Sequence, residues 1–241
     1  MFGFMVVGLL FYIGIIGAFF LKEYMNFYDS KYHRVSNHTF METFFDKGNN
    51  GEYKIFRQLE QINISKLILT NLYIPKKDGS TTEIDVLMIT KFGFFVVESK
   101  NYSGWVFGNE KHSHWTQTFP NRQKYKFFNP IWQNKGHITA LKEVLGITDD
   151  SLMQSLIVFS DECKLKKITV SSQGVHVLNR RRLRQVFKRE LHDAAPVFTS
   201  EDIKAYFRIL KPYIRATAQT KELHIQKIKE KLGNGTQTAE K

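Results

Sequence analysis

The sequence predicts a mixed α/β fold preceded by a membrane-spanning helix, and three observations lead to this prediction. The chain has 241 residues, of which 42% are hydrophobic and 14% aromatic, enough to fill a hydrophobic core. Its apolar residues recur at helical spacing in some segments and form strand-like runs in others. Its first segment is apolar and uncharged. Without that segment and a polar tail, roughly 150 to 190 residues remain, the size of one domain.

The apolar run at residues 2–21 is long enough to cross a bilayer. A helix rises about 1.5 Å per residue, so this length matches a hydrocarbon core about 30 Å thick. A cleaved signal peptide is the alternative, but no basic residue precedes the run and no A-x-A site precedes Lys22. Basic side chains follow it at Lys31, Arg34 and Lys47. The positive-inside rule therefore predicts a single-pass anchor at 1–21 with the C-terminal domain in the cytoplasm.

Residues 22–46 are predicted to form a juxtamembrane linker with room for a short helix. This segment is polar and aromatic, with Tyr24, Phe27, Tyr28 and Tyr32 near its start. Aromatic residues gather where a membrane meets water, so an interfacial belt explains them.

Periodicity predicts the elements of the domain at residues 47–195. Tyr53, Phe56, Leu59 and Ile62 recur every three residues, which predicts an amphipathic helix with Glu52 in its first turn. Strand-like runs follow, separated by turn residues such as those at 76–80. The predicted order is α-β-β-β-α-β, with a further strand after it, and the ranges are 51–62, 67–74, 82–90, 94–100, 129–145, 152–159 and 174–178.

The C-terminal part is predicted to be a helical extension at 196–232 followed by a flexible tail at 233–241. The sequence from Thr199 to Asp202 is typical of a helix start. Pro212 is expected to interrupt this helix before a further helical stretch.

The charge balance indicates polyanionic partners. There are 35 Lys and Arg against 23 Asp and Glu, a net charge of +12, which favours nucleic acid or an anionic membrane surface. A solvated cationic surface without such a partner is the alternative. Cys163 is the single cysteine, so no intramolecular disulfide and no cysteine-based zinc site can form, in keeping with a reducing compartment. We expect its thiol to be inert.

Three charged residues gather near one end of a predicted hairpin. Asp85 lies in the strand at 82–90, and Glu98 and Lys100 lie in the strand at 94–100. Residues two apart on a strand share a face, so Glu98 and Lys100 point the same way. Charges at strand ends are usually solvated, but these follow a fully apolar run.

The turn between the two strands decides whether Asp85 joins this pair. A two-residue turn at 91–92 pairs Thr90 with Gly93, and therefore Asp85 with Glu98, on the same face. A three-residue turn would shift the register by one and place Asp85 on the wrong face unless a bulge restores it. The hypothesis of a joint site depends on the shorter turn.

Carboxylates at close range repel each other, and a divalent cation relieves that repulsion. Mg²⁺ typically uses one or two carboxylates together with water and substrate phosphate. Such an ion activates water and neutralises charge on a phosphodiester. Lys100 would stabilise the charged transition state, and Glu52, early in the preceding helix, is a plausible third carboxylate.

The longer pattern resembles the nuclease-related domain, NERD, of the PD-(D/E)XK nuclease superfamily. Asp85 followed by Glu98-Ser99-Lys100 resembles the D...(D/E)xK signature, with Ile84 where the superfamily's nominal Pro would stand. The resemblance covers about residues 47–160, and the segments that carry it are KGNNGE at 47–52, EIDVL at 83–87, GFFVVESKNYSG at 93–104 and the stretch from Asn129-Pro130 through Gln133-Asn134 to His137.

The resemblance implies an αβββαβ restriction-endonuclease-like core and a metal-dependent site. It implies Mg²⁺, or Mn²⁺, held by Asp85, Glu98 and the Ser99 carbonyl, with Lys100 as the catalytic lysine and auxiliary roles for Glu52 and Gln133. The predicted function is therefore a membrane-anchored nuclease that hydrolyses DNA phosphodiester bonds. A catalytically weak or inactive nucleic-acid-binding module and a membrane-associated scaffold with a basic surface are the alternatives.

Other motifs have two readings each. Basic residues at 180–189, with Lys164, Lys166 and Lys167, fit phosphates or anionic lipid. Aromatic residues at 115–128, interleaved with Arg122, Lys124 and Lys126, fit base stacking or a partly buried loop. His112 and His114, on an expected loop between Trp105 and Trp115, are ordinary polar residues or a metal pair. His137 is expected to be a packing or polar-network residue, with a role in the site left open.

Overall fold

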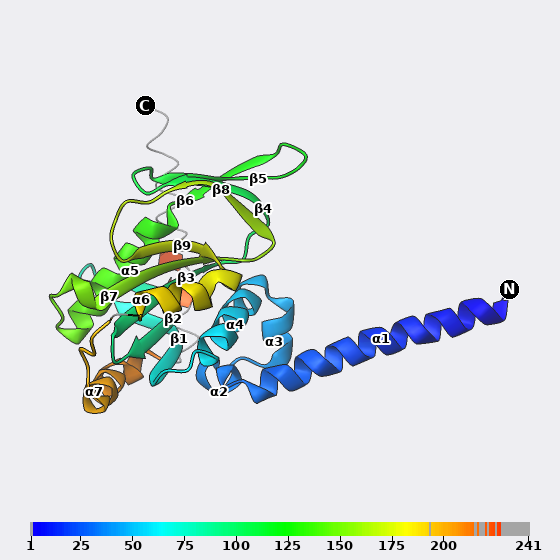
Figure 1. Cartoon of the computed structure of the whole chain (residues 1–241), viewed down its shortest axis with the longest axis horizontal. Helices are drawn as coiled ribbons and strands as arrows, with labels where there is room; N and C mark the ends of the chain where they lie inside the picture. Colours follow the sequence, from blue (N-terminus) through cyan, green and yellow to red (C-terminus); the bar gives the residue numbers. More distant parts are fainter. Residues whose placement is uncertain are drawn as a thin grey trace.

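The computed structural model describes residues 2–192, 194–214, 216, 220, 222–224 and 226–227. It is a mixed α/β structure with two mixed β-sheets, and an apolar N-terminal helix projects from it (Figure 1). The predicted succession of one helix, three strands, one helix and one strand is present, and additional strands follow its third strand.

Sheet A has five strands in the order β1-β2-β3-β7-β9. The first three are antiparallel because short turns join them, whereas β3, β7 and β9 run parallel. Their bounds are Lys66–Pro75, Thr81–Thr90, Gly93–Lys100, Met153–Phe159 and Val175–Asn179. Each of the predicted strands matches one of these within two residues.

Sheet B has four strands in the order β6-β5-β4-β8 and lies above sheet A in Figure 1. Its strands are β4 Gly104–Asn109, β5 His114–Thr118, β6 Lys124–Phe128 and β8 Cys163–Thr169. The loop predicted between Trp105 and Trp115 is therefore confirmed only at residues 110–113, which hold His112, and was predicted too long. These strands are short and exposed to solvent on one face. Strand β4 also pairs in parallel with β8, which is distant in sequence, and a local sequence pattern does not reveal such a pairing.

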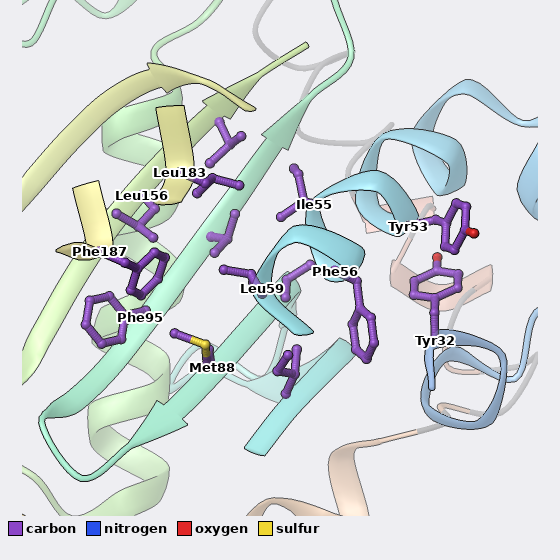
Figure 2. Packing of buried hydrophobic residues seen from close by; sticks show 14 of the residues in the cluster. Tyr32, Tyr53, Ile55, Phe56, Leu59, Met88, Phe95, Leu156, Leu183 and Phe187 are labelled. Atoms are coloured by element: carbon purple, nitrogen blue, oxygen red, sulfur yellow. The ribbon is translucent and has the colours of Figure 1, made fainter. Parts of the chain in front are cut away.

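Helices cover both faces of sheet A. On one face lie α4 Lys47–Glu60 and α6 Leu183–Glu190, and on the other α5 Pro130–Leu145 and α7 Ser200–Leu210. Figure 2 shows the first face, where Phe56 and Leu59 of α4 and Phe187 of α6 pack over Met88 and Phe95 of the sheet. Sheet A is thus buried on both faces, which explains the continuous apolar runs in its strands.

The N-terminal helix α1 spans Phe2–Asp29 and leaves the domain at its lower right in Figure 1. Its segment Val7–Asp29 contains an 18-residue window with a mean hydropathy of 1.6, and none of that window is buried. This one exposed apolar helix is compatible with a membrane span or with a signal sequence.

The segment between α1 and the domain is helical and packed. It contains α2 Tyr32–Ser36 and α3 Phe40–Phe45. Phe27 and Tyr32 are 1% and 0% exposed, and their rings pack against Tyr53 of α4. The membrane-belt interpretation is therefore wrong for these two residues, which belong to the domain core. Sequence alone does not distinguish a buried aromatic residue from an interfacial one.

Helix caps explain the remaining boundaries. Asp46 caps α4, so the helix begins four residues earlier than predicted and Glu52 lies in its second turn. Asn129 caps α5 ahead of Pro130, and Thr199 caps α7 as expected. Single 3-10 turns lie at Asp150–Leu152, Arg180–Arg182 and Lys211–Tyr213, and the last holds Pro212. The tail at 233–241 and most of the stretch expected to be helical after Pro212 lie outside the described residues.

Candidate metal-dependent active site

The register of the hairpin is the one that the short turn predicts. Thr90 pairs with Gly93 across a two-residue turn, and the ladder continues to the pair Val86 and Val97. Gly93 has a φ of 121°, and a Cβ there would meet the Leu152 carbonyl oxygen at 2.6 Å. Glycine is thus required at this turn, and the register that follows from it makes Asp85 and Glu98 the next facing residues.

The pairing between β1 and β2 is interrupted at Asp85. The ladder between β1 and β2 skips Asp85 and the facing Asn71, which adopts a left-handed φ of 53°. Asp85 Oδ2 instead accepts a hydrogen bond of 2.7 Å from the Ser99 backbone N–H. Next to Glu98, β2 and β3 are therefore joined by the Asp85 side chain and not by a backbone hydrogen bond.

Glu98 forms the centre of a buried polar cluster. It is 1% exposed, and its Oε1 lies 2.6 Å from Lys100 Nζ. Its Oε2 lies 3.0 Å from His137 Nε2. Lys100 Nζ also donates to Gln133 Oε1 at 3.0 Å. Gln133 and His137 stand four residues apart on α5, so one face of this helix holds both ends of the Glu98 and Lys100 pair.

His137 is fixed from its other side by β2. Its Nδ1 lies 2.6 Å from Thr82 Oγ1. The sequence left the role of His137 open and gave no signal for Thr82. The spacing of four from Gln133 is the signal that could have placed His137 in the cluster.

Glu52 reaches this region from α4. Its Oε2 is buried and has no hydrogen-bond partner in the described part of the chain. The helix approaches β3 closely at the preceding residue, where a Cβ on Gly51 would lie 3.1 Å from Asn101 Cβ and 3.2 Å from Ser99 Oγ. Glycine at 51 therefore permits the approach that carries Glu52 towards the cluster.

Burial and charge give the carboxyl groups different protonation behaviour. Burial and then repulsion by Glu98 raise the pKa of Asp85 well above its usual range. Burial and then repulsion by Asp85 do the same to the pKa of Glu52. Burial would also raise the pKa of Glu98, but Lys100 and His137 outweigh it and lower that pKa. The pKa of Lys100 is raised, because attraction by Glu98 outweighs its burial.

This donor set fits a hard divalent cation. Asp85 and Glu98 supply two carboxylates, and Mg²⁺ is usually bound by one or two carboxylates together with water. The raised pKa of Asp85 and the orphaned oxygen of Glu52 are both features that a cation would relieve. Within the described residues, no three His, Cys, Asp or Glu side chains lie close enough together to surround an ion. An ion bound to Asp85 and Glu98 would therefore need further oxygen ligands.

The other candidate residues lie outside this cluster or at its edge. Arg180 lines a small space with Ser99 and Lys100, and its Nη2 bonds Asp161 Oδ2 at 2.9 Å. Arg182, Lys188 and Arg189 line a separate cleft of about 780 Å³ beside β8 and β9. His112 is exposed on the connection from β4 to β5, and His114 is exposed as the first residue of β5. Cys163 is buried, which raises the pKa of its thiol to about 11.

Comparison with known proteins gives one family and one relative. Residues 47–160 match the family model described as nuclease-related domain, NERD. An uncharacterized protein of Bacillus anthracis is 39% identical over 133 residues, which cover 55% of this chain and 61% of that protein. The match thus spans less than two thirds of the relative's length. No solved structure matches.

Proposed function

We propose that this chain, whose residues 47–160 match the nuclease-related domain family, is a membrane-anchored, Mg²⁺-dependent nuclease that hydrolyses DNA phosphodiester bonds. The observation that carries this proposal is the buried cluster in which Glu98 pairs with Lys100 while Asp85 binds the backbone of Ser99. Burying these charges is costly, and Asp85 adds a second carboxylate that Glu98 repels. A catalytic role explains it.

Asp85, Glu98 and the Ser99 carbonyl would hold the Mg²⁺ or Mn²⁺ ion. When bound, the ion supplies a Lewis acid and lowers the pKa of a bound water. Each carboxylate oxygen has two lone pairs, so Glu98 can keep its hydrogen bonds to Lys100 and His137 and still contribute a ligand.

Lys100 would stabilise negative charge that develops on the phosphate. Glu98 and Gln133 hold its ammonium group at 2.6 and 3.0 Å, so little reorganisation is needed when the substrate arrives. The pKa of Lys100 is raised by Glu98, which keeps the group charged at neutral pH. Glu52, with its orphaned oxygen and raised pKa, would accept a hydrogen bond from a water in the site.

The net charge of +12 supports a nucleic-acid substrate, since phosphate contacts by Lys and Arg dominate such binding. Two observations support the membrane anchor. The apolar window of α1 is exposed, and α3 extends the apolar surface beside it. Phe44 of α3 lies 4.9 Å from Phe20, while Met41 and Phe45 are 60% and 65% exposed. The basic residues after the span support a cytoplasmic domain.

A cleavage assay of the full chain in nanodiscs tests the enzymatic proposal. Single-stranded and duplex DNA and RNA would be incubated with increasing Mg²⁺ or Mn²⁺, and wild type compared with Asp85→Asn and Lys100→Ala. We expect metal-dependent cleavage of DNA in the wild type only. Lys54→Ala is the matched control, because Lys54 is exposed on α4 and contributes nothing to the cluster. Cleavage that persists in Lys100→Ala would exclude this site as its source.

A binding module without catalysis is the second candidate. It is favoured because both Glu98 oxygens already have protein partners, Lys100 and His137, so that the cluster is satisfied without a metal ion. This candidate requires that Asp85→Asn bind nucleic acid like the wild type and that no metal concentration produce cleavage.

The mass of the mature protein, recovered from membranes, tests the anchor. Retention of residues 2–21 and resistance to alkaline extraction are expected. A protein that begins after this segment and is released into solution would establish a signal sequence instead.

A further inference from the structure

Sheet B joins the two elements that hold the candidate active site. Its first strand begins at Gly104, four residues after Lys100, and β6 ends at Phe128, next to the Asn129 cap of α5. Gln133 follows on that helix. Sheet B is therefore connected directly to β3, which ends at Lys100, and to α5, which holds Gln133.

One face of sheet B packs in the hydrophobic core. Val106 and Trp115 are 0% and 1% exposed, and the Trp115 ring stacks on Phe159 of β7 with an interplanar angle of 7°. Phe127 packs in the same cluster. Because strand residues alternate between faces, the residues between these point away from the core.

The register assigns the outward residues. Phe107 pairs with Thr116, and Thr116 pairs with Lys126. Phe107 also pairs with Lys167 of β8. Trp105, Phe107, Lys124, Lys126, Phe128 and Lys167 form what we call the lysine-aromatic face.

Charge on this face has one sign. The four strands of sheet B contain no Asp or Glu, whereas β6 has two Lys and β8 has three. All five of these lysines are exposed. Lys166 Nζ lies 5.7 Å from the centre of the Trp105 ring, a cation-π arrangement. Acidic residues stand only beside the strands: Glu110 bonds Ser171 in a turn, and Glu162 precedes β8.

Aromatic rings on this face are accessible. Phe107 and Phe128 are 38% and 49% exposed. Phe128 also lies 6.2 Å from the ring of Trp132, which is 41% exposed and directly precedes Gln133. The exposed ring of Phe128 in sheet B therefore neighbours that of Trp132, on the helix that holds Lys100 through Gln133.

We propose that the lysine-aromatic face binds single-stranded nucleic acid and delivers it to the candidate active site. Lysines would contact successive phosphates, and unpaired bases would stack on Phe107, Phe128 and Trp132. A duplex hides its base faces in its own stack and cannot use these rings. This inference rests on the proposed function and sharpens it, since it names a single strand as the substrate class.

Binding of a fluorescein-labelled oligothymidine to the full chain in nanodiscs of neutral lipid tests this proposal. A chelator prevents cleavage, so that binding is measured apart from catalysis, and a hairpin duplex of equal length is the second probe. We expect tighter binding of the single strand. Phe128→Ala should weaken it about fivefold or more, the effect of losing one stacked base. Lys126→Ala and Lys167→Ala should each reduce the slope of log K against log salt by about 0.7.

Tyr125→Ala is the matched control for Phe128→Ala. Tyr125 is 54% exposed on the same strand, but it pairs with Gln117 on the opposite side of the sheet. Equal losses in the two variants would overturn the proposal, and so would duplex binding as tight as that of the single strand. If Lys126→Ala weakens binding to anionic nanodiscs but leaves binding of the oligothymidine unchanged, the face binds lipid and the proposal is overturned.

The result is separable from the enzymatic proposal. A chain that binds the single strand through this face but cleaves nothing with Mg²⁺ or Mn²⁺ refutes the nuclease and keeps the binding face. Metal-dependent cleavage of a single strand that is unchanged in Phe128→Ala, Lys126→Ala and Lys167→Ala refutes the face and keeps the nuclease. Unfolding midpoints of each variant confirm that the fold is intact.

Discussion

Glu98 Oε1 lies 2.6 Å from Lys100 Nζ at a position where the glutamate side chain is 2% exposed and the lysine side chain 15%. Removing one partner of a buried ion pair leaves an uncompensated charge, whereas removing both often costs little. Stability and activity should therefore respond differently to single and double substitutions at this pair.

Lys100→Ala should lower the free energy of unfolding by about 3 to 5 kcal/mol, because Glu98 is left buried without its cation. Combining Glu98→Gln with Lys100→Met should recover most of that loss, since neither partner is then charged. Neither variant should cleave nucleic acid. Urea unfolding in the absence of metal, together with the cleavage assay, checks both expectations. A double variant that is no more stable than Lys100→Ala would show that the pair does not act as a unit.

Asp85→Asn should stabilise the metal-free protein at neutral pH. The folded-state pKa of Asp85 is raised, so the folded state binds more protons than the unfolded one and loses stability as pH rises from about 4. Asparagine removes this loss and keeps an oxygen for the Ser99 N–H. The gain over wild type should shrink towards pH 4.

Unfolding midpoints measured between pH 4 and pH 8 with a chelator check this expectation. Added Mg²⁺ or Mn²⁺ should then raise the midpoint of the wild type more than that of Asp85→Asn, since the ion binds the folded state through Asp85. A variant whose midpoint runs parallel to that of the wild type across this range would contradict the raised pKa.

The relative placement of Asp85, Glu98 and Lys100 could be predicted from the sequence because it depends on local rules. The two-residue turn at 91–92 fixes the register of Asp85 with Glu98, and alternation along β3 fixes the face that Lys100 shares. Asn129 and Pro130 mark the start of α5, which places Gln133 one turn into the helix.

The parts that could not be predicted depend on contacts distant in sequence. Strand β4 pairs with β8 nearly sixty residues further on, so sheet B has no local signature. Phe27 and Tyr32 look like membrane-interface residues until α4 is seen to bury them. The left-handed Asn71, which opens the sheet beside Asp85, follows from no residue pattern in β1.

Thr82→Val should lower cleavage and cost about 1 to 3 kcal/mol of stability, because it leaves the buried His137 Nδ1 without its partner. The Thr82 hydroxyl fixes His137 Nδ1 at 2.6 Å, and His137 in turn holds Glu98 Oε2. His137→Ala removes a partner of a buried carboxylate and should cost about 1 to 3 kcal/mol as well as activity. Urea unfolding and cleavage rates for both variants, with Thr139→Val on the exposed side of α5 as the control, measure these effects. Full activity in both variants would remove His137 from the site.

Gly51→Ala and Gly136→Ala form a pair that separates helix propensity from the closeness of α4 to β3. Both glycines lie inside helices, so alanine favours each helix by about 0.5 to 1 kcal/mol. Around Gly136 nothing lies within 4 Å of an added Cβ, whereas at Gly51 the Cβ would meet Asn101 Cβ at 3.1 Å. Gly136→Ala should therefore be more stable than wild type and fully active.

Gly51→Ala should lack that gain, because α4 or the end of β3 must shift by a few tenths of an ångström. The shift would move Glu52 and Ser99 relative to each other, and misplacement of reacting groups by 1 Å can cost about 100-fold in rate. We expect a clear loss of cleavage in Gly51→Ala at an unfolding free energy close to that of the wild type. If Gly51→Ala matches Gly136→Ala in both stability and rate, then the close approach of α4 to β3 does not position the site.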